Sequence, residues 1–205
     1  MATKERFVGV SFDDGPNSQN IQEILAILRE NNCQATFFWI AEFAKKFSDQ
    51  DRNLFSKIIR ELKVSEHEIG LHAPSDYAPT FLSRAYSQFS KEEIKIAIAD
   101  LEELTGQKVR LYRPHYLLQP ASIIFARQLG LSTVFGDAIH YASADASTEV
   151  QIKKFSGARS GSILIFHDGT TLQRKTTHIL EVLPQVLDNL KGLGLTPTKA
   201  SAVLS

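Results

Sequence analysis

The chain has 205 residues, 43% of them hydrophobic and 22% charged, a composition that suffices for the core of one globular domain. Its 23 basic and 23 acidic side chains cancel, so the charge indicates neither a nucleic acid nor a membrane as partner. The single cysteine, Cys33, excludes a disulfide within the chain. Because no run of 18 apolar residues and no apolar leader occurs, we expect a cytoplasmic protein, or a secreted one if a signal peptide is missing from this sequence.

Short apolar runs, typical of buried strands, alternate with stretches of helical periodicity. The expected strands are 7–12, 35–40, 69–72, 109–112, 133–135, 162–166 and 195–198, and the expected helices include 21–28, 54–62, 94–104 and 179–190. This alternation predicts an α/β fold in which helices cover a parallel sheet. Periodicity alone leaves open whether the sheet closes into a barrel or stays open and doubly wound. Residues 136–157 are the least periodic, and we expect a long loop there, within a single domain spanning 1–205.

Two adjacent carboxylates, Asp13 and Asp14, end the first expected strand in the sequence Ser-Phe-Asp-Asp-Gly-Pro. The C-terminal ends of parallel strands form the ligand-binding face of α/β folds. Two like charges at such a place are costly unless a cation or a hydrogen-bond donor compensates them. A solvated turn that caps the next helix explains the same residues, because aspartate favours turns and helix N-caps. The hexapeptide alone does not decide between these interpretations.

Other polar side chains follow later expected strands. His72 and Asp76 are four residues apart, so both can reach one metal ion if the segment turns helically. Arg113 and His167 each follow an expected strand directly, and Arg113 can pair with a carboxylate. Each of these residues alone has an ordinary structural explanation. Together they would gather at one rim of a parallel fold, where a metal site, a spare carboxylate and a separate histidine favour hydrolysis.

In this order the motifs resemble those of the polysaccharide deacetylase family, which includes chitin and peptidoglycan N-acetylglucosamine deacetylases. The resemblance covers nearly the whole chain and rests on five segments: 11–16, 35–38, 68–72, 113–114 and 163–169. It implies a distorted parallel barrel of the (β/α)7 type. It also implies a metal-dependent hydrolase that removes N-acetyl groups from N-acetylated amino sugars. The partner that we expect is therefore an N-acetylated carbohydrate, with no nucleic acid and no membrane.

The resemblance also implies a set of metal ligands. Asp14 and His72 would bind the metal, and Asp76 would be the third ligand, at a position where the commonest family pattern has a histidine. Zinc is the expected metal. Cobalt and manganese are the alternatives, because a carboxylate in place of an imidazole shifts the preference towards oxygen-binding cations.

Catalytic and substrate-binding roles follow from the same resemblance. Asp13 would be the general base, Arg113 would orient it, and His167 would protonate the leaving amine. Substrate contacts would come from Pro114, His115 and Tyr116, whose backbone N–H would help to hold the oxyanion.

The chain departs from the family pattern in two further places. His115-Tyr116-Leu117 stands where Pro-Tyr-Gly is common, and 136–145 contains no clear counterpart of the family's Asp-Trp motif. Two alternatives therefore remain. One is a small-amide hydrolase of the deformylase type, and the other is a catalytically silent relative that binds carbohydrate. None of these patterns predicts the oligomeric state.

Overall fold

Seven parallel strands build one curved sheet in the computed structural model, which describes residues 6–77, 80, 86–115, 119–137, 147–168 and 178–204. The strands are β1 (Phe7–Gly15), β2 (Thr36–Ile40), β3 (Glu68–Ala73), β4 (Leu111–Tyr112), β5 (Ser132–Thr133), β6 (Ile163–His167) and β7 (Thr196–Thr198). Each overlaps a strand expected from the sequence. The predicted parallel α/β fold is therefore confirmed.

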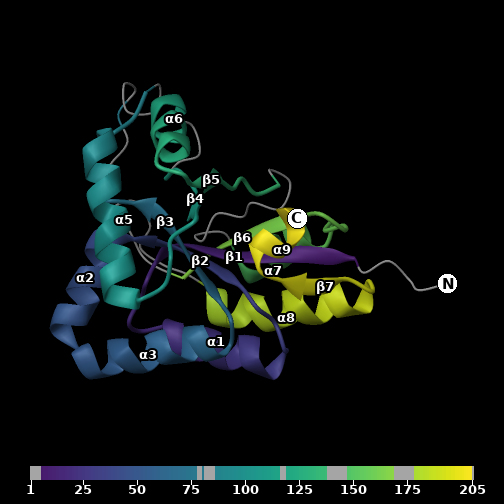
Figure 1. Cartoon of the computed structure of the whole chain (residues 1–205). Helices are drawn as coiled ribbons and strands as arrows, with labels where there is room; N and C mark the ends of the chain where they lie inside the picture. The colour runs from purple at the N-terminus through teal and green to yellow at the C-terminus, as the bar shows by residue number, and fades with distance from the viewer. Residues whose placement is uncertain are drawn as a thin grey trace.

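The order of the strands is β5-β4-β3-β2-β1-β6, and β7 pairs with the first residues of β1, which runs through the middle of the molecule (Figure 1). The segment after β5 brings the two edges of this sheet together. The backbone N–H of Asp137 donates to the carbonyl of Ile163 at 3.1 Å, and Gly136 packs so closely against Ile165 that a Cβ would lie 2.4 Å from that side chain. The sheet therefore curls into a distorted barrel of the (β/α)7 type, as the family resemblance implied.

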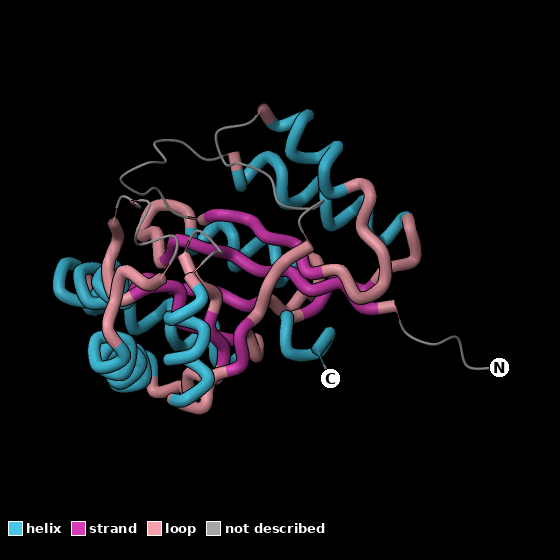
Figure 2. Tube along the Cα trace, turned by 90° about the horizontal axis from the view of Figure 1, so that it is seen from above, coloured by secondary structure: helices cyan, strands magenta, loops and turns pink. Residues whose placement is uncertain are grey.

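Helices lie on both sides of the strands (Figure 2). They are α1 (Ile21–Glu30), α2 (Ala41–Gln50), α3 (Arg52–Val64), α5 (Lys91–Thr105), α6 (Pro120–Gln128), α7 (Thr148–Phe155), α8 (Ile179–Gly192) and α9 (Ala200–Leu204). The apolar periodicity correctly predicts α1, α3, α5 and α8. The expectation of a loop over 136–157 is wrong for its last part, where the Ser147 side chain accepts from the backbone N–H of Val150 and starts α7.

Two apolar layers result from the alternation of side chains along the strands. On β1, Val8, Val10 and Phe12 belong to the large core between the strands and the helices. The residues between them, Gly9 and Ser11, face the barrel interior. That interior holds a smaller apolar cluster of Phe38, Leu111, Val134, Ile163 and Ala200. The interior of the barrel is thus filled by side chains up to the level at which β1 ends.

The short helix α9 fills the amino end of the barrel. A Cβ on Gly9 would lie 3.4 Å from the Cα of Ala200, so the absence of a side chain at Gly9 lets the helix approach the strand. The backbone N–H of Ala200 donates to the Thr36 hydroxyl at 2.8 Å, which fixes the start of the helix to β2. With its amino end filled, the barrel keeps its polar chemistry at the carboxyl end.

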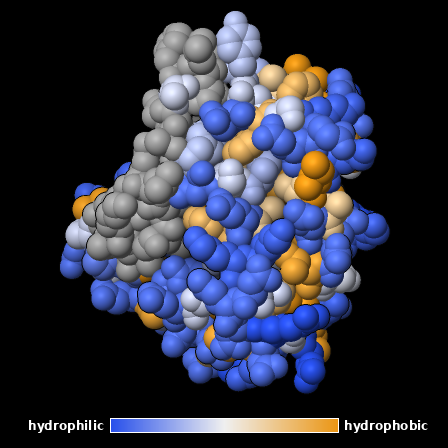
Figure 3. Space-filling model, turned by 90° about the vertical axis from the view of Figure 1, so that its left-hand side faces the viewer, coloured by the Kyte–Doolittle hydropathy of each residue, from blue (hydrophilic) through white to orange (hydrophobic). Residues whose placement is uncertain are grey.

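The outer surface of the helices is mainly polar. Figure 3, which views the left-hand side of Figure 1, shows hydrophilic residues over most of that face, with apolar residues between them. This is the pattern of amphipathic helices that turn their apolar side to the sheet. Within the residues that the structure describes, no helix has the length and apolar character needed to cross a membrane.

Candidate active site

The carboxyl ends of β1, β3 and β6 bring the sequence-predicted residues together. Asp13 lies beside His167 in the register of β1 and β6, while His72 is on β3 and Arg113 follows β4. All four side chains are buried. Sequence reasoning placed these residues at one rim, and the structure gathers them there.

Asp14 has a backbone conformation that differs from that of a regular strand. Consecutive side chains of a regular strand point to opposite faces, but Asp14 has a φ of 66°, in the left-handed region. Aspartate tolerates that region better than most residues, at a cost of about 1–3 kcal/mol. Because the alternation is broken here, Asp13 and Asp14 both contact residues at the carboxyl end of the barrel.

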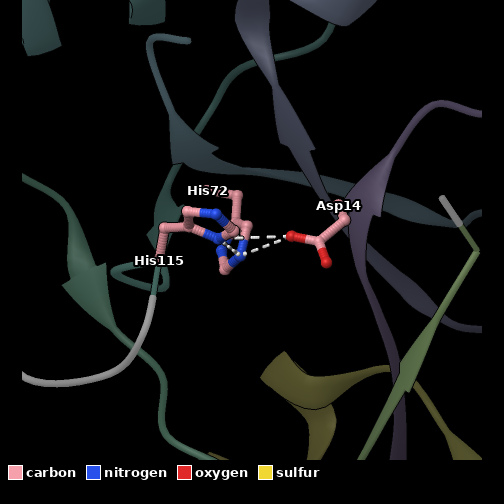
Figure 4. A group of neighbouring side chains, drawn as sticks. All are labelled: Asp14, His72 and His115. Carbon is pink, nitrogen blue, oxygen red and sulfur yellow. Dashed lines mark hydrogen bonds and ion pairs between the residues drawn. The ribbon is translucent and has the colours of Figure 1, made fainter. Parts of the chain in front are cut away.

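Asp14, His72 and His115 form a compact, buried group (Figure 4). The Nε2 atom of His72 and the Nδ1 atom of His115 are 2.8 Å apart, and each lies 3.2 Å from Oδ1 of Asp14. Ligand atoms that share a zinc ion at about 2.0–2.2 Å are themselves roughly 3 Å apart. The three residues therefore fit a single divalent cation.

The proton on His72 is held away from the centre of this group. Nδ1 of His72 lies 2.8 Å from the carbonyl oxygen of Arg113, which only accepts hydrogen bonds. Nδ1 therefore carries the proton, and the lone pair of Nε2 faces Asp14 and His115. Burial lowers the pKa of His72 to about 3, an effect that the charge of Asp13 opposes, so the ring is neutral at pH 7. A neutral imidazole with its lone pair at the centre is the form that binds metal.

Asp76 lies outside this group of three. Its Oδ1 atom is 3.6 Å from Nε2 of His115, the ring nitrogen that does not face Asp14. The geometry therefore offers His115 as the third ligand, where sequence reasoning chose Asp76 and gave His115 a substrate contact. The signal in the sequence is the exchange itself: the family's histidine is missing at 76, and an unusual histidine occurs at 115.

Arg113 holds Asp13 in place. Its Nη1 atom donates to Oδ1 of Asp13 at 2.7 Å and to the hydroxyl of Ser11 at 2.8 Å. Nε donates to the carbonyl of Val134 at 3.2 Å, and the guanidinium lies 4.1 Å from the centre of the Phe38 ring. The arginine is thus fixed by contacts on several sides of the barrel interior.

The charge of Arg113 also determines the protonation of Asp13. Burial alone would raise the pKa of this carboxyl, but the charge and hydrogen bond of Arg113, with contributions from His72 and His167, hold the pKa below its usual value. Asp13 is therefore ionised at pH 7, the state that a general base needs.

His167 ends β6 beside Asp13 and is neutral at pH 7. Burial lowers its pKa to about 4, although the charge of Asp13 acts in the opposite direction. A neutral imidazole next to an ionised carboxylate can accept a proton and then pass it on.

Asp168 is a buried carboxyl group whose importance sequence reasoning missed. Burial, and then the charge of Asp13, raise its pKa to about 8, while the backbone N–H groups of Asp168 and Asn17 oppose this rise. The side chain lies against Gly15, where a Cβ would be 2.5 Å from both carboxyl oxygens. Residue 15 must therefore be glycine, because the carboxyl group of Asp168 occupies the space that a side chain there would need.

Some predicted features have no described counterpart at the site. Tyr116 and residues 138–146 lie outside the described residues, as does most of the segment searched for an Asp-Trp motif. Pro114 is buried after β4. The only tryptophan of the sequence, Trp39, is packed in the outer core near Phe55 and not at this site.

The chain is similar to known deacetylases in sequence and in fold. The family model described as "Polysaccharide deacetylase" matches residues 1–134. A chitooligosaccharide deacetylase of Azorhizobium caulinodans is 31% identical over 163 residues, which cover 78% of this chain and 72% of that protein. A bifunctional xylanase/xylan deacetylase of Cellvibrio japonicus is 27% identical over 195 residues, 93% of this chain. The chain spans only 26% of the length of that protein.

A solved structure supports the fold. The wild-type pseudoenzyme of the CE4 family from Bacillus anthracis superposes with a TM-score of 0.76 at 19% identity, over 98% of this chain and 66% of that one. At this identity the likeness establishes the barrel and leaves the activity to the residues of the site. Since the family model matches well over half of the sequence, the chain belongs to the polysaccharide deacetylase family.

Proposed function

We propose that this chain is a metal-dependent hydrolase that removes N-acetyl groups from N-acetylated amino sugars. The observation that carries the proposal is the position of an ionised carboxylate, Asp13, directly beside a group that fits a metal ion. An ionised base next to a metal site is the arrangement that hydrolysis by activated water requires. The names of the related deacetylases support a saccharide substrate.

The metal that we propose is zinc, with cobalt or manganese as alternatives. Asp14, His72 and His115 would hold it through one carboxylate oxygen and two imidazole nitrogens, a ligand set that zinc accepts. When bound, such a cation polarises the acetyl carbonyl and lowers the pKa of a water molecule.

Asp13 and His167 would then carry out the proton transfers of the reaction. Asp13, kept ionised by Arg113, takes a proton from the water that attacks the acetyl carbonyl carbon. His167, neutral at rest, receives this proton from Asp13, its neighbour on β1, and delivers it to the nitrogen of the departing amino sugar, so that Asp13 is ionised again. The family resemblance implies that the backbone N–H of Tyr116, a residue outside the described part of the chain, would help to hold the oxyanion.

Acetate release tests this proposal. The protein is stripped with a chelator, given Zn²⁺, Co²⁺ or Mn²⁺ in turn, and incubated with N-acetylglucosamine monomers and oligomers. We expect metal-restored release that increases with chain length. Release from monomers alone would favour the small-amide alternative. A protein that binds metal but releases no acetate from monomers or oligomers contradicts the proposal for N-acetylglucosamine: the acyl group or the sugar is then a different one, or the chain is the catalytically silent relative.

A further inference from the structure

His115 lies between two carboxylates that contact different nitrogens of its ring. Nδ1 is 3.2 Å from Asp14 and 2.8 Å from the Nε2 atom of His72, and Nε2 is 3.6 Å from Asp76. The ring stands nearly perpendicular to that of His72, at 80°, with the ring of Tyr77 against it at 70°. The ring of His115 is thus confined by residues from the ends of β1 and β3.

A neutral imidazole carries one proton, and its position decides whether His115 can bind a metal. With the proton on Nδ1, the N–H would point into the group formed with Asp14 and His72. With the proton on Nε2, the N–H faces Asp76 and the Nδ1 lone pair faces the centre. A carboxylate on the Nε2 side stabilises the second form, the one that binds a cation.

His72 has a related arrangement with a closer acceptor: its contact with the carbonyl of Arg113 is a hydrogen bond of 2.8 Å, whereas the 3.6 Å between Nε2 of His115 and Asp76 is an ion-pair distance. The carbonyl of Arg113 lies behind its Nδ1 atom, so its lone pair also faces the centre. Both imidazoles therefore have an oxygen acceptor behind the ring and a lone pair directed at one point. Asp76 thus has the place behind His115 that the carbonyl of Arg113 has behind His72.

Hydrogen bonds to backbone carbonyl groups attach the loop that carries Asp76 to its neighbours. The neighbouring Tyr77 hydroxyl donates to the carbonyl of His115 at 3.4 Å, and the Gln119 amide donates to the same carbonyl at 2.7 Å. The carbonyl of Pro74 accepts from the backbone N–H of Glu42 at 3.0 Å. The loop that carries Asp76 is therefore attached both to α2 and to the backbone of His115.

We propose that Asp76 is a positioning residue that sets the tautomer of His115, and that His115 and not Asp76 is the third metal ligand. The proposal rests on the metal site of the proposed function, but its test does not require turnover. In the commonest family pattern the residue at the position of Asp76 is itself a metal ligand. In this chain the residue at 115 would be the ligand, and the residue at 76 would support it.

Metal affinity is the first test. The Kd for Zn²⁺ of the chelator-stripped protein is measured by competition with a chromophoric chelator, and stoichiometry by elemental analysis. We expect Asp76→Asn to weaken binding about 10–100-fold while one ion still binds per chain. His115→Ala should weaken it more. Asp188→Asn, an exposed aspartate on α8, is the matched control and should leave the Kd unchanged. Thermal unfolding of each metal-free variant checks that it folds.

The second test counts the histidine ligands of the metal and locates the proton of His115. A merely structural role for Asp76 does not predict these two results. Pulsed EPR of the Cu²⁺-loaded protein should show two coordinated imidazoles in the wild type and in Asp76→Asn, and one in His115→Ala. Long-range ¹H–¹⁵N spectra of the Zn²⁺-loaded protein should show the proton of His115 on Nε2. If His115→Ala keeps the wild-type Kd while Asp76→Asn loses the ion, Asp76 is the ligand and the proposal is wrong. A wild-type protein that binds no metal overturns it as well, whereas lack of acetate release with intact metal binding contradicts only the proposed function.

Discussion

The two ends of the barrel satisfy their polar groups in different ways. At the amino end, the Thr36 hydroxyl accepts from the backbone of Ala200 and donates to Glu68, which also contacts the hydroxyl of Ser201. These donors and acceptors are paired with one another within the protein. At the carboxyl end, two imidazole nitrogens and the carboxylate of Asp14 converge on one point. The comparison shows that one end is completed by α9 and the other offers a group that fits a cation, so substitutions at the two ends should affect different properties.

The largest effect is expected at the carboxyl end, on turnover. Asp13→Asn keeps the size of the side chain and an acceptor for Arg113 but removes the base, and we expect kcat to fall about 10²–10⁴-fold. Bound metal should remain at one ion per chain, because Asp13 is not among the three residues of the metal group. Acetate release and metal content measure the two quantities. Unchanged turnover would show that Asp13 is not the base.

A second effect at the same end concerns stability and its dependence on pH. Because Asp168 has a pKa of about 8 in the folded chain, it keeps a proton between about pH 4 and pH 8 that the unfolded chain releases. The group therefore destabilises the fold increasingly as the pH rises through this range. Asp168→Asn removes this dependence, and we expect the free energy of unfolding at pH 7 to rise by on the order of 3 kcal/mol.

Urea denaturation of the metal-free protein at pH 4 and pH 7 tests this expectation. The gain should be small at pH 4, close to the pKa of 3.8 of an ordinary aspartate, because the unfolded wild type has there released only part of the proton that the folded wild type keeps. Asp188→Asn serves as control, because that side chain is exposed and its replacement should not alter the pH dependence. An equal gain at both pH values would mean that the amide acts through packing and not through the proton.

The smallest effect is expected at the amino end, and on stability alone. Thr36→Val preserves the shape of the side chain but removes the acceptor of the Ala200 N–H and the donor to Glu68. We expect a loss of about 1–2 kcal/mol in the free energy of unfolding, measured by urea denaturation. The Kd for Zn²⁺ and kcat should stay within twofold of the wild type. A large change in either would show that the two ends are coupled.

The sequence predicts the parts of this fold that local patterns encode. Apolar spacing reveals α1, α3, α5 and α8, and the apolar run ending in Asp13 and Asp14 reveals β1. Apolar spacing does not reveal α2. This helix begins directly after β2, with Ile40 as its N-cap residue and without a side-chain cap. Apolar spacing also misses α7, a short helix in a segment of weak periodicity.

The candidate site shows the same difference between what local patterns encode and what three-dimensional packing determines. Five of its residues lie at the carboxyl ends of strands or directly after them and were identifiable from the sequence, because these ends meet at one rim: Asp13, Asp14, His72, Arg113 and His167. The position of His115 depends instead on how the loop after β4 folds back over His72, 43 residues earlier. A spacing of four residues suggested Asp76, but only the three-dimensional packing places the nitrogen of His115 closer to Asp14.

Residues 134–137, directly after β5, have an evolutionary consequence. They close the barrel through the Asp137 to Ile163 hydrogen bond and hold Arg113 through the carbonyl of Val134, both of them backbone groups. The half-exposed side chain of Phe135 takes part in neither contact, whereas residue 136 must remain glycine because a Cβ there would lie 2.4 Å from Ile165. Substitutions can therefore accumulate at position 135 while the backbone contacts that close the barrel and hold Arg113 are inherited intact.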